Sequence, residues 1–533
     1  MRKVWLMAVA AAAACVVIWG ADWPSQGGNP QRDGWAKYEK AFTKENVHDL
    51  QLLYTYQADN QAIGSNALTA PLINGLLITY RGFKEMLVFG GSSNMVYSVD
   101  ADLNRLIWKV QLSSKRHDAN KEARGSCSGG MTAALAMPGS STASGRAGGF
   151  RRVPVPPPGA PAPNPAMTRP PAPPPNPGLL ATGFGRPGAF LAVGNDGDLH
   201  VLNTSTGEDR VPPVPFVPAG ANVSSLNVSD ETVYAATSDN CGGAPNAIYA
   251  ADLSSATPKI ASFVTNGTGT SGTLGTAVAK DGTVYAQIAS GHGDLAGEYN
   301  DTVIALSSRT LTAKDYFTAA AKQKSTGKGA TPMIFDWKGK ELVVAAGADG
   351  SLYLLDATSL GGPDHHQPLS KTDPIGAEFR GGFASWEDTA TGKRWVYASL
   401  GGASLPSAKF PAQNGKASDG SIVAFIVEER DGHPTLVPAW ISGNIAAPSP
   451  VVIANGLVFV LAGGDSDKKN SHAVLYALDG ESGKQLYSSQ SLVQSFSHSD
   501  GLAIANRRIY FTTHDNAVYC FGFLTDQLQL TGK

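Results

Sequence analysis

The sequence has few charged residues and little excess charge of either sign. Only 16% of its 533 residues are Asp, Glu, Lys or Arg, and 42 basic residues nearly balance 44 acidic ones, for a formal net charge of -2. This balance excludes a strongly basic nucleic-acid-binding protein and an acidic disordered tail. Charged helix-forming runs are scarce as well, which argues against helix bundles and coiled coils.

Cysteine is also scarce, with four residues in the whole chain. The sequence has no Cys-x-x-Cys-His segment, so covalent c-type haem is excluded. It has neither a Cys-x-x-Cys pair nor a His-Glu-x-x-His motif, so no strong zinc signature exists. Cys127, Cys241 and Cys520 follow the N-terminal segment, and in an oxidising compartment they allow one disulfide and one free thiol.

After the N-terminus, no stretch of the sequence is long and apolar enough to span a membrane. At the N-terminus itself, two basic residues precede an apolar run from Val4 to Ile18, which ends before Asp22. This pattern is typical of an export signal, so residues 1–21 are predicted to be a signal peptide or an N-terminal anchor. Cys15 follows a run of alanines and is either a lipid-attachment site or part of an ordinary signal. Export to the periplasm or cell envelope of a bacterium is therefore expected.

Glycine is abundant, with 60 residues, and β-branched and aromatic residues gather in short runs between turn sequences. The pattern is clearest near the C-terminus, where runs at 447–454 and 457–462 flank a turn at 455–456. Two further runs follow at 473–479 and 485–488. Together they predict a unit of four short antiparallel strands joined by tight turns.

This unit recurs along the chain. Its third strand is found eight times, at 95–100, 199–203, 248–252, 303–306, 352–356, 422–425, 476–479 and 518–521. The innermost strands are expected to begin near Ala70, Thr132, Ser225, Leu274, Thr331, Phe383, Pro450 and Gly501. A four-stranded unit with this period cannot bury its faces alone, whereas a radial arrangement buries them. The sequence predicts one all-β domain over residues 22–533, an eight-bladed β-propeller of four-stranded antiparallel blades.

The two ends of the chain are predicted to meet in one blade. The eighth copy of the unit ends after three strands, near Phe523. The segment 50–57 precedes the first inner strand and has the pattern of an unpartnered outer strand. We expect it to complete the last blade, because this closes the ring and removes an open sheet edge.

Residues 138–178 form an insertion rich in proline, predicted to lie between the first and second strands of blade two. Such a segment favours polyproline II and cannot form a strand ladder. It is either a disordered surface loop or a docking arm for the groove of a partner.

The repeat motif, a strand with Leu-Tyr-x-Leu-Asp-x-x-(Ser/Thr)-Gly-Lys, resembles the repeats of pyrroloquinoline quinone (PQQ) propellers. The segments 22–34 and 43–50 are similar to the opening of quinoprotein alcohol dehydrogenases. The same superfamily includes a non-catalytic propeller lipoprotein that assists outer-membrane protein assembly. The resemblance therefore implies one of two functions. One is a divergent oxidoreductase acting on alcohols or sugars with PQQ and a divalent cation such as Ca²⁺. The other is an envelope scaffold that binds a protein partner.

The resemblance also implies site residues. In those enzymes an oxygen-ligated cation polarises the quinone, a carboxylate takes the alcohol proton, and an aromatic ring and a disulfide between adjacent cysteines sandwich the cofactor. Asn240 matches a metal-binding and cofactor-binding Asn of the family, and Asp196 is a substitute for the acidic metal ligand expected in blade two. Further cofactor-binding candidates are Arg124, Cys127, Arg380 and Trp386.

The sequence departs from the enzyme pattern at two places. Cys127 stands alone where the dehydrogenases have an adjacent cysteine pair, and the segment 265–272 lacks the expected catalytic Asp. No catalytic residue is assigned for this reason. These departures favour the scaffold, whereas the dehydrogenase-like opening favours the oxidoreductase.

Strand order predicts which loops share a face of the propeller. Loops that lead into a blade and loops between its second and third strands emerge on the same face. Cys127 lies in a loop of the first kind and Cys241 in one of the second kind, in adjacent blades, so we predict that they form a disulfide, whereas Cys520 is expected to be buried. The same face collects polar residues that form either a solvated surface or a ligand funnel: His117, Asp118, Glu122, Arg124, residues 290–301, Glu378, Arg380, His498 and Asp500. Trp108 and Trp440, in outer strands, are expected to pack on neighbouring blades.

Overall fold

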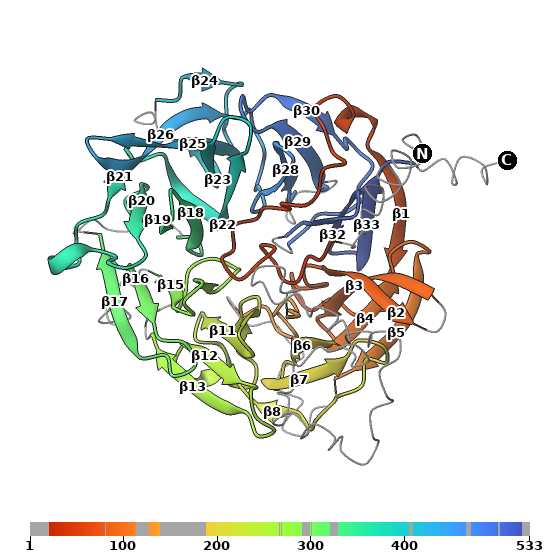
Figure 1. Ribbon diagram of the computed structural model, residues 1–533. Helices are drawn as coiled ribbons and strands as arrows, with labels where there is room; N and C mark the ends of the chain where they lie inside the picture. Colours follow the sequence, from red (N-terminus) through yellow and green to blue (C-terminus); the bar gives the residue numbers. More distant parts are fainter. Residues whose placement is uncertain are drawn as a thin grey trace, which may run out of the picture.

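Eight small antiparallel sheets are arranged as blades around a central axis, with almost no helix (Figure 1). The predicted eight-bladed propeller is therefore confirmed. The computed structural model describes residues 21–79, 82–112, 127–138, 188–265, 267, 269–289, 299, 301–319, 329–404, 409–464, 471–498 and 501–524. The predicted signal segment with Cys15, the Pro-rich insertion beyond Pro138, and Arg124 lie outside these residues. No helix within them is long and apolar enough to cross a membrane.

Within each of the first four blades, the strands follow one another along the chain from the innermost strand outwards. Blade 1 contains β2 (Leu72–Thr79), β3 (Gly82–Gly91), β4 (Met95–Asp100) and β5 (Arg105–Gln111). Blade 2 contains β6 (Ala189–Val193), β7 (Asp198–Asn203) and β8 (Val214–Pro215). Blade 3 contains β10 (Asn227–Ser229), β11 (Thr232–Ser238), β12 (Ala247–Asp252) and β13 (Lys259–Val264), with β9 (Asn222–Val223) paired to β11. Blade 4 contains β14 (Ala277–Val278), β15 (Val284–Ile288), β16 (Thr302–Leu306) and β17 (Ala313–Thr318).

The last four blades complete the ring. Blade 5 contains β18 (Met333–Trp337), β19 (Lys340–Ala346), β20 (Leu352–Asp356) and β21 (Ser370–Lys371). Blade 6 contains β22 (Gly376–Asp388), β23 (Lys393–Ser404), β25 (Gly420–Arg430) and β26 (His433–Ile441), with β24 (Ala412–Gln413) added in parallel to β26. Blade 7 contains β27 (Val452–Ala454), β28 (Leu457–Ala462), β29 (Val474–Asp479) and β30 (Gln485–Ser488). Blade 8 contains β31 (Ala503–Ala505), β32 (Arg508–Thr512), β33 (Ala517–Gly522) and β1 (Gln51–Gln57). Short 3-10 turns lie at η1 (Val47–Asp49), η2 (Cys241–Gly243) and η4 (Gly362–Asp364).

The burial of the strands explains their sequences. Strands in the middle of a blade, such as β15, β28 and β33, are buried along their whole length, because each blade packs between two neighbours. Their sequences are therefore almost continuously apolar. Outer strands such as β1 and β13 alternate between more and less exposed residues, since one of their faces meets solvent.

Blade 2 departs from the regular four-stranded pattern. Its innermost strand is reduced to a bridge between Ala136 and Leu191, and β8 pairs with β7 through two residues only. The sequence around β8 contains Pro212, Pro213 and Pro215, which have no N–H to donate to a ladder. The outer strand of this blade is therefore short.

The two ends of the chain close the ring as predicted. β1 pairs antiparallel with β33, with Leu52 opposite Phe521 and Tyr56 opposite Val518. Cys520 in β33 is a free, buried cysteine, and its burial raises the pKa of the thiol to about 12. Closure leaves blade 8 with four strands and protects the edge of β33.

The segment Ala21–Ala36, here called the N-terminal strap, runs along the inner strands of the blades, over the centre of the ring in Figure 1. Trp23 and Ser25 bridge to blades 1 and 2, at Ile73 and Ala136. Successive strap carbonyls then accept hydrogen bonds from later blades: Pro30 from Val278 N at 2.8 Å, Gln31 from Ile334 N at 3.0 Å, Asp33 from Ser385 N at 2.8 Å and Gly34 from Ile453 N at 2.8 Å. Ala21 N donates to Asn506 Oδ1 of blade 8 at 2.7 Å. One strap thus contacts blades on all sides of the ring.

Arg32 fixes the strap to blades 3 and 4. Its side chain is fully buried, and within the described residues it has no carboxylate partner. Its nitrogens donate to backbone carbonyls of Leu226 at 3.0 Å, Leu274 at 2.9 Å and Thr276 at 3.0 Å, and to Ser25 Oγ at 3.2 Å. Burial without a counterion lowers the pKa of the guanidinium to about 9, so it remains charged at neutral pH.

Two tryptophans join neighbouring blades, as expected. Trp108 Nε1 donates to Thr204 O of blade 2, and Trp440 Nε1 donates to Gly480 O of blade 7, both at 2.9 Å. Each indole lies against a glycine of the (Ser/Thr)-Gly turn of the repeat, Gly207 or Gly483. A Cβ at Gly483 would lie 2.3 Å from Trp440 Cε3, so the glycine of the motif is required by this contact.

Replacing Arg32 with Leu is expected to lower the free energy of unfolding by about 3 kcal/mol or more, because several buried carbonyls lose their donor. Urea denaturation of the purified protein measures this change. Arg309→Leu is the matched control: its side chain is 44% exposed and lies 3.4 Å from Asp252 Oδ2, so the change should stay within about 0.5 kcal/mol. Equal effects of the two substitutions would contradict the role given to Arg32.

Replacing Gly483 with Ala is expected to cost about 2 kcal/mol more than Gly432→Ala. Both glycines have positive φ, 71° and 79°, so the backbone strain is alike, but nothing lies within 4 Å of a Cβ at Gly432. The difference in thermal or urea midpoint between the two variants measures the close contacts of a Cβ at Gly483, chiefly with Trp440 and also with Asn414 Nδ2. Indistinguishable midpoints would show that the indole moves aside without cost.

Candidate functional site

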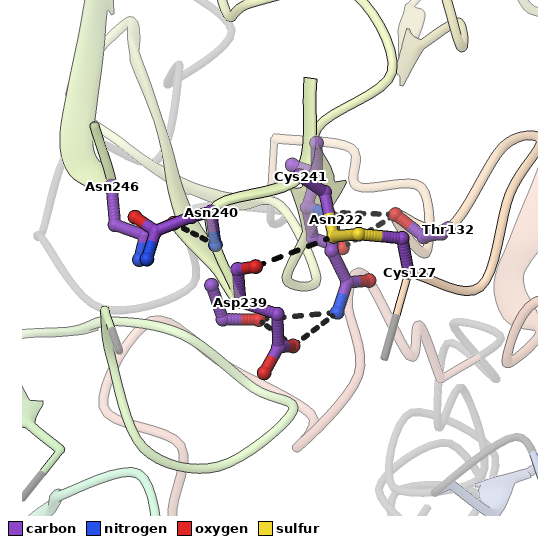
Figure 2. Close-up of a disulfide and its surroundings, with 9 residues drawn as sticks. Cys127, Thr132, Asn222, Asp239, Asn240, Cys241 and Asn246 are labelled. Atoms are coloured by element: carbon purple, nitrogen blue, oxygen red, sulfur yellow. Dashed lines mark hydrogen bonds between the residues drawn. A yellow bond between two sulfur atoms is a disulfide. The ribbon is translucent and has the colours of Figure 1, made fainter. Parts of the chain in front are cut away.

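A disulfide joins blades 2 and 3 on one face of the ring (Figure 2). Cys127 precedes blade 2 and Cys241 lies in η2, between β11 and β12, and their Cα atoms are 5.7 Å apart. The structure thus contains the predicted pairing. Because the two cysteines are separated by 114 residues, the bridge is a link between blades and not a ring of adjacent cysteines.

Hydrogen bonds beside the disulfide link the same two blades and brace the cysteine loop of blade 3. Thr132 Oγ1 donates to Val223 O at 3.0 Å and accepts from Val223 N at 2.8 Å. Asn222 Nδ2 donates to Ser238 Oγ at 3.1 Å and to Asp239 Oδ2 at 2.8 Å, as Figure 2 shows for the carboxylate. This part of the face is therefore fixed by covalent and polar contacts.

Next to the disulfide, inside the ring, lies a cavity of about 300 Å³, here called the axial cavity. Its described wall comes from the inner parts of blades 1, 2, 3, 4 and 8, and from Gln26 of the strap. It comprises residues 65–70, Ser128, Thr132, Ala134, 222–225, Ala236, Ser238, Thr270, Gly272, Thr273, His498 and 512–514. The volume is at the lower end of the range for small-molecule sites.

Hydroxyl groups dominate this wall. Five of its residues are serines and six are threonines, with three carboxamide side chains and two histidines. Among the described wall residues there is no Asp, Glu, Lys or Arg. Within the described part of the chain, the side-chain hydroxyls of Ser65, Ser128, Thr270 and Thr273 have no hydrogen-bond partner. They are therefore free to bind a ligand.

Two histidines occupy the blade 8 side of the cavity. The ring of His514 stacks on Phe496, with centroids 4.6 Å apart, and its Nε2 lies 2.9 Å from Gly64 O. His498 meets the same Phe496 edge-on, with centroids 5.0 Å apart. Phe496 thus positions both imidazoles at the cavity. Of these residues the sequence singled out only His498.

Asn240 and Asp196, the two predicted metal ligands, have local structural roles. Asn240 is exposed and has φ 52°, its N–H donates to Asn246 Oδ1 at 3.1 Å and its Nδ2 donates to Gly267 O at 3.2 Å. Asp196 is 1% exposed, and its Oδ1 accepts from Asp198 N at 3.1 Å in the turn between β6 and β7. Asp349 makes the same turn contact with Ser351 N in blade 5, at 3.0 Å. The acidic residue is therefore part of the repeat.

Of the other predicted cofactor-binding residues that the structure describes, Cys127 is near the cavity, next to Ser128 in its wall. Arg380 is half-buried in β22, and its guanidinium lies 3.5 Å from Glu378 Oε1. Trp386 is 9% exposed, stacks on Trp395 with centroids 6.5 Å apart, and is not a wall residue. Its ring packs in the core between blades 6 and 7, and its role as a cofactor platform stays a prediction.

One carboxyl group on the same face has a raised pKa. Asp301 precedes β16, and burial raises its pKa to about 6. Its Oδ2 accepts from Ala348 N of blade 5 at 3.1 Å, and its Oδ1 accepts from Gln287 Nε2 at 3.3 Å. Within the described residues, no group of three or more His, Cys, Asp or Glu side chains is placed to hold a metal ion. Asp301 is therefore a link between blades 4 and 5.

Comparisons with known proteins bear on the fold. No protein-family model and no curated protein matches the sequence. Among solved structures, quinohemoprotein alcohol dehydrogenase ADHIIG from Pseudomonas putida HK5 is similar, with a TM-score of 0.56, 13% identity, and coverage of 94% of this chain and 80% of that chain. The quinohemoprotein alcohol dehydrogenase from Comamonas testosteroni has a TM-score of 0.54 at 13% identity, with the same coverage. A europium-containing methanol dehydrogenase has a TM-score of 0.56 at 12% identity and covers 94% of this chain and 98% of that one. The chain thus has the PQQ-type propeller fold.

Proposed function

We propose that the protein is an exported propeller that binds a small polar molecule in the axial cavity. The observation that carries this proposal is a cavity of about 300 Å³ with partnerless hydroxyls in its wall. A concave site with a few convergent polar groups is the usual form of a small-molecule site. Its floor and walls are held by Arg32 and the disulfide, so little ordering is required when a ligand binds.

Export is part of the same proposal. The N-terminal sequence has the pattern of an export signal. The bridge between Cys127 and Cys241 suits an oxidising compartment such as the periplasm.

A PQQ and cation pair does not fit the described residues. A quinone that carries carboxylates is held best by Arg or Lys, and a hard cation requires several oxygen ligands, including carboxylates. The described wall offers hydroxyls, carboxamides and imidazoles instead. Trp386 is packed in the core, and the Asn240 amide is bonded to Gly267 O. We therefore derive no quinone-dependent oxidation for this site.

A scaffold function that holds an envelope protein has a separate basis. The outer strand β13 of blade 3 exposes Ile260 and Val264, by 41% and 49%, on a sheet edge. Such an edge is suited to strand addition by a partner. This function does not use the axial cavity, so the two are tested independently.

The binding function is tested by thermal unfolding of the mature protein with single probes: D-glucose, myo-inositol, citrate, L-lysine, and PQQ with CaCl₂. At least one probe is expected to raise the Tm, because a ligand that binds only the folded state stabilises it in proportion to the logarithm of its excess over Kd. In Ser128→Trp, which places an indole in the cavity wall, the same probe should give no shift.

Thr389→Trp is the control for the added indole, because Thr389 is exposed and is not a wall residue. This variant should keep the Tm shift of the unmodified protein. A shift retained by Ser128→Trp would move the binding site away from the axial cavity, and the absence of any shift across all five probes would count against the function.

A further inference from the structure

The chemistry of the axial cavity indicates the class of its ligand. Hydroxyl and carboxamide groups donate and accept hydrogen bonds and carry no net charge. An anionic ligand is matched best by guanidinium or ammonium groups, and a cation by carboxylates. The hydroxyl groups of a ligand also donate and accept, so they match a wall of serines and threonines. The described wall therefore favours an uncharged ligand with many hydroxyls.

The partnerless hydroxyls lie on different sides of the cavity. Ser65 precedes blade 1, Ser128 precedes blade 2, and Thr270 and Thr273 precede blade 4. Thr270 is 7% exposed as a whole residue, and its hydroxyl, which has no protein partner in the described residues, is open to the solvent of the cavity. A ligand hydroxyl can take the place of water at such a group. Hydrogen bonds from several sides also orient a compact ligand.

The strap forms one boundary of the cavity. Gln26 of the strap lies at the cavity, and its carbonyl oxygen accepts from Arg32 Nη1 while its Oε1 accepts from Ser225 Oγ. These bonds hold the strap in place at the cavity wall. A volume of about 300 Å³ is sufficient for one small ring.

We infer that the axial cavity takes an uncharged, cyclic polyhydroxylated molecule, bound directly by side-chain hydroxyls without a cation or an anionic cofactor. This inference rests on the proposed binding function and specifies its ligand. It also separates this chain from proteins that share its fold and are named as quinohemoproteins.

Isothermal titration with myo-inositol and D-glucose tests the inference, with citrate and PQQ plus CaCl₂ as charged probes, at low and at high NaCl. A neutral probe is expected to bind with a Kd that does not change with salt, because no charge is neutralised. Thr270→Val and Thr273→Val should each weaken this binding about 2- to 10-fold, the loss of one hydrogen bond.

Thr276→Val is the matched control. Thr276 is close in sequence to Thr270 and Thr273 and is buried. Its Oγ1 has no partner within the described residues, and it is not a wall residue. Its substitution should leave the Kd unchanged, and an equal loss in all three variants would overturn the inference. Salt-sensitive binding of citrate or PQQ plus CaCl₂, without binding of a neutral probe, would overturn the ligand class and leave the binding function standing. Binding of no probe would overturn both.

Discussion

The fully buried cation Arg32 sets the relation between the strap, blade 3 and blade 4. Removing a guanidinium from water without a counterion is costly, and the structure offsets this cost with carbonyl acceptors from the strap, from blade 3 and from the segment that leads into blade 4. These acceptors keep the side chain in one orientation, since each is fixed by the backbone of an inner strand or of the strap. Ser225 and Thr273, which neighbour two of the acceptors in sequence, belong to the wall of the axial cavity. The shape of the cavity therefore depends on an interaction just outside it.

The strap and β1 close the ring by contacting blade 8, which comes from the other end of the propeller sequence. Ala21 contacts Asn506, 485 residues away, and β1 supplies the fourth strand of the last blade. Residues 21–57 thus complete their contacts only after blade 8 has formed. Contacts between residues so far apart in sequence cost loop-closure entropy before their favourable contact energy is gained. Closure of the ring is therefore expected to come late in folding. The disulfide between blades 2 and 3 lowers this cost over a long stretch of the chain in between.

The blades were predictable from sequence because their signals are local. Third strands with the Leu-Tyr-x-Leu-Asp pattern and turns such as Asn455-Gly456 placed six of the inner strands within two or three residues of their positions in the structure. Closure by 50–57 was predictable from counting strands. The path of the strap was not predictable. Backbone carbonyls such as those of Pro30 and Gly34 make its contacts, and every residue has a carbonyl whatever its side chain. The cavity wall was missed for a related reason: serine and threonine are common on every surface, so only the fold shows that Ser65, Ser128 and Thr270 converge.

Asp196, Trp386 and Cys127 show how a repeat fold reuses residues that resemble a cofactor site. Asp196 caps a turn that also occurs in blade 5, and Trp386 fills the core between blades 6 and 7. Cys127 forms a disulfide with Cys241 of the next blade. Its sulfur therefore links two blades and is not part of a disulfide between adjacent cysteines. The aromatic ring and the sulfur of the proposed sandwich are thus both used for packing. A planar cofactor would have to displace core contacts to find its platforms, whereas a small hydroxylated ring needs only the hydroxyls that already face the cavity. Because these side chains are already used for packing, the structure favours a small hydroxylated ring over a planar cofactor.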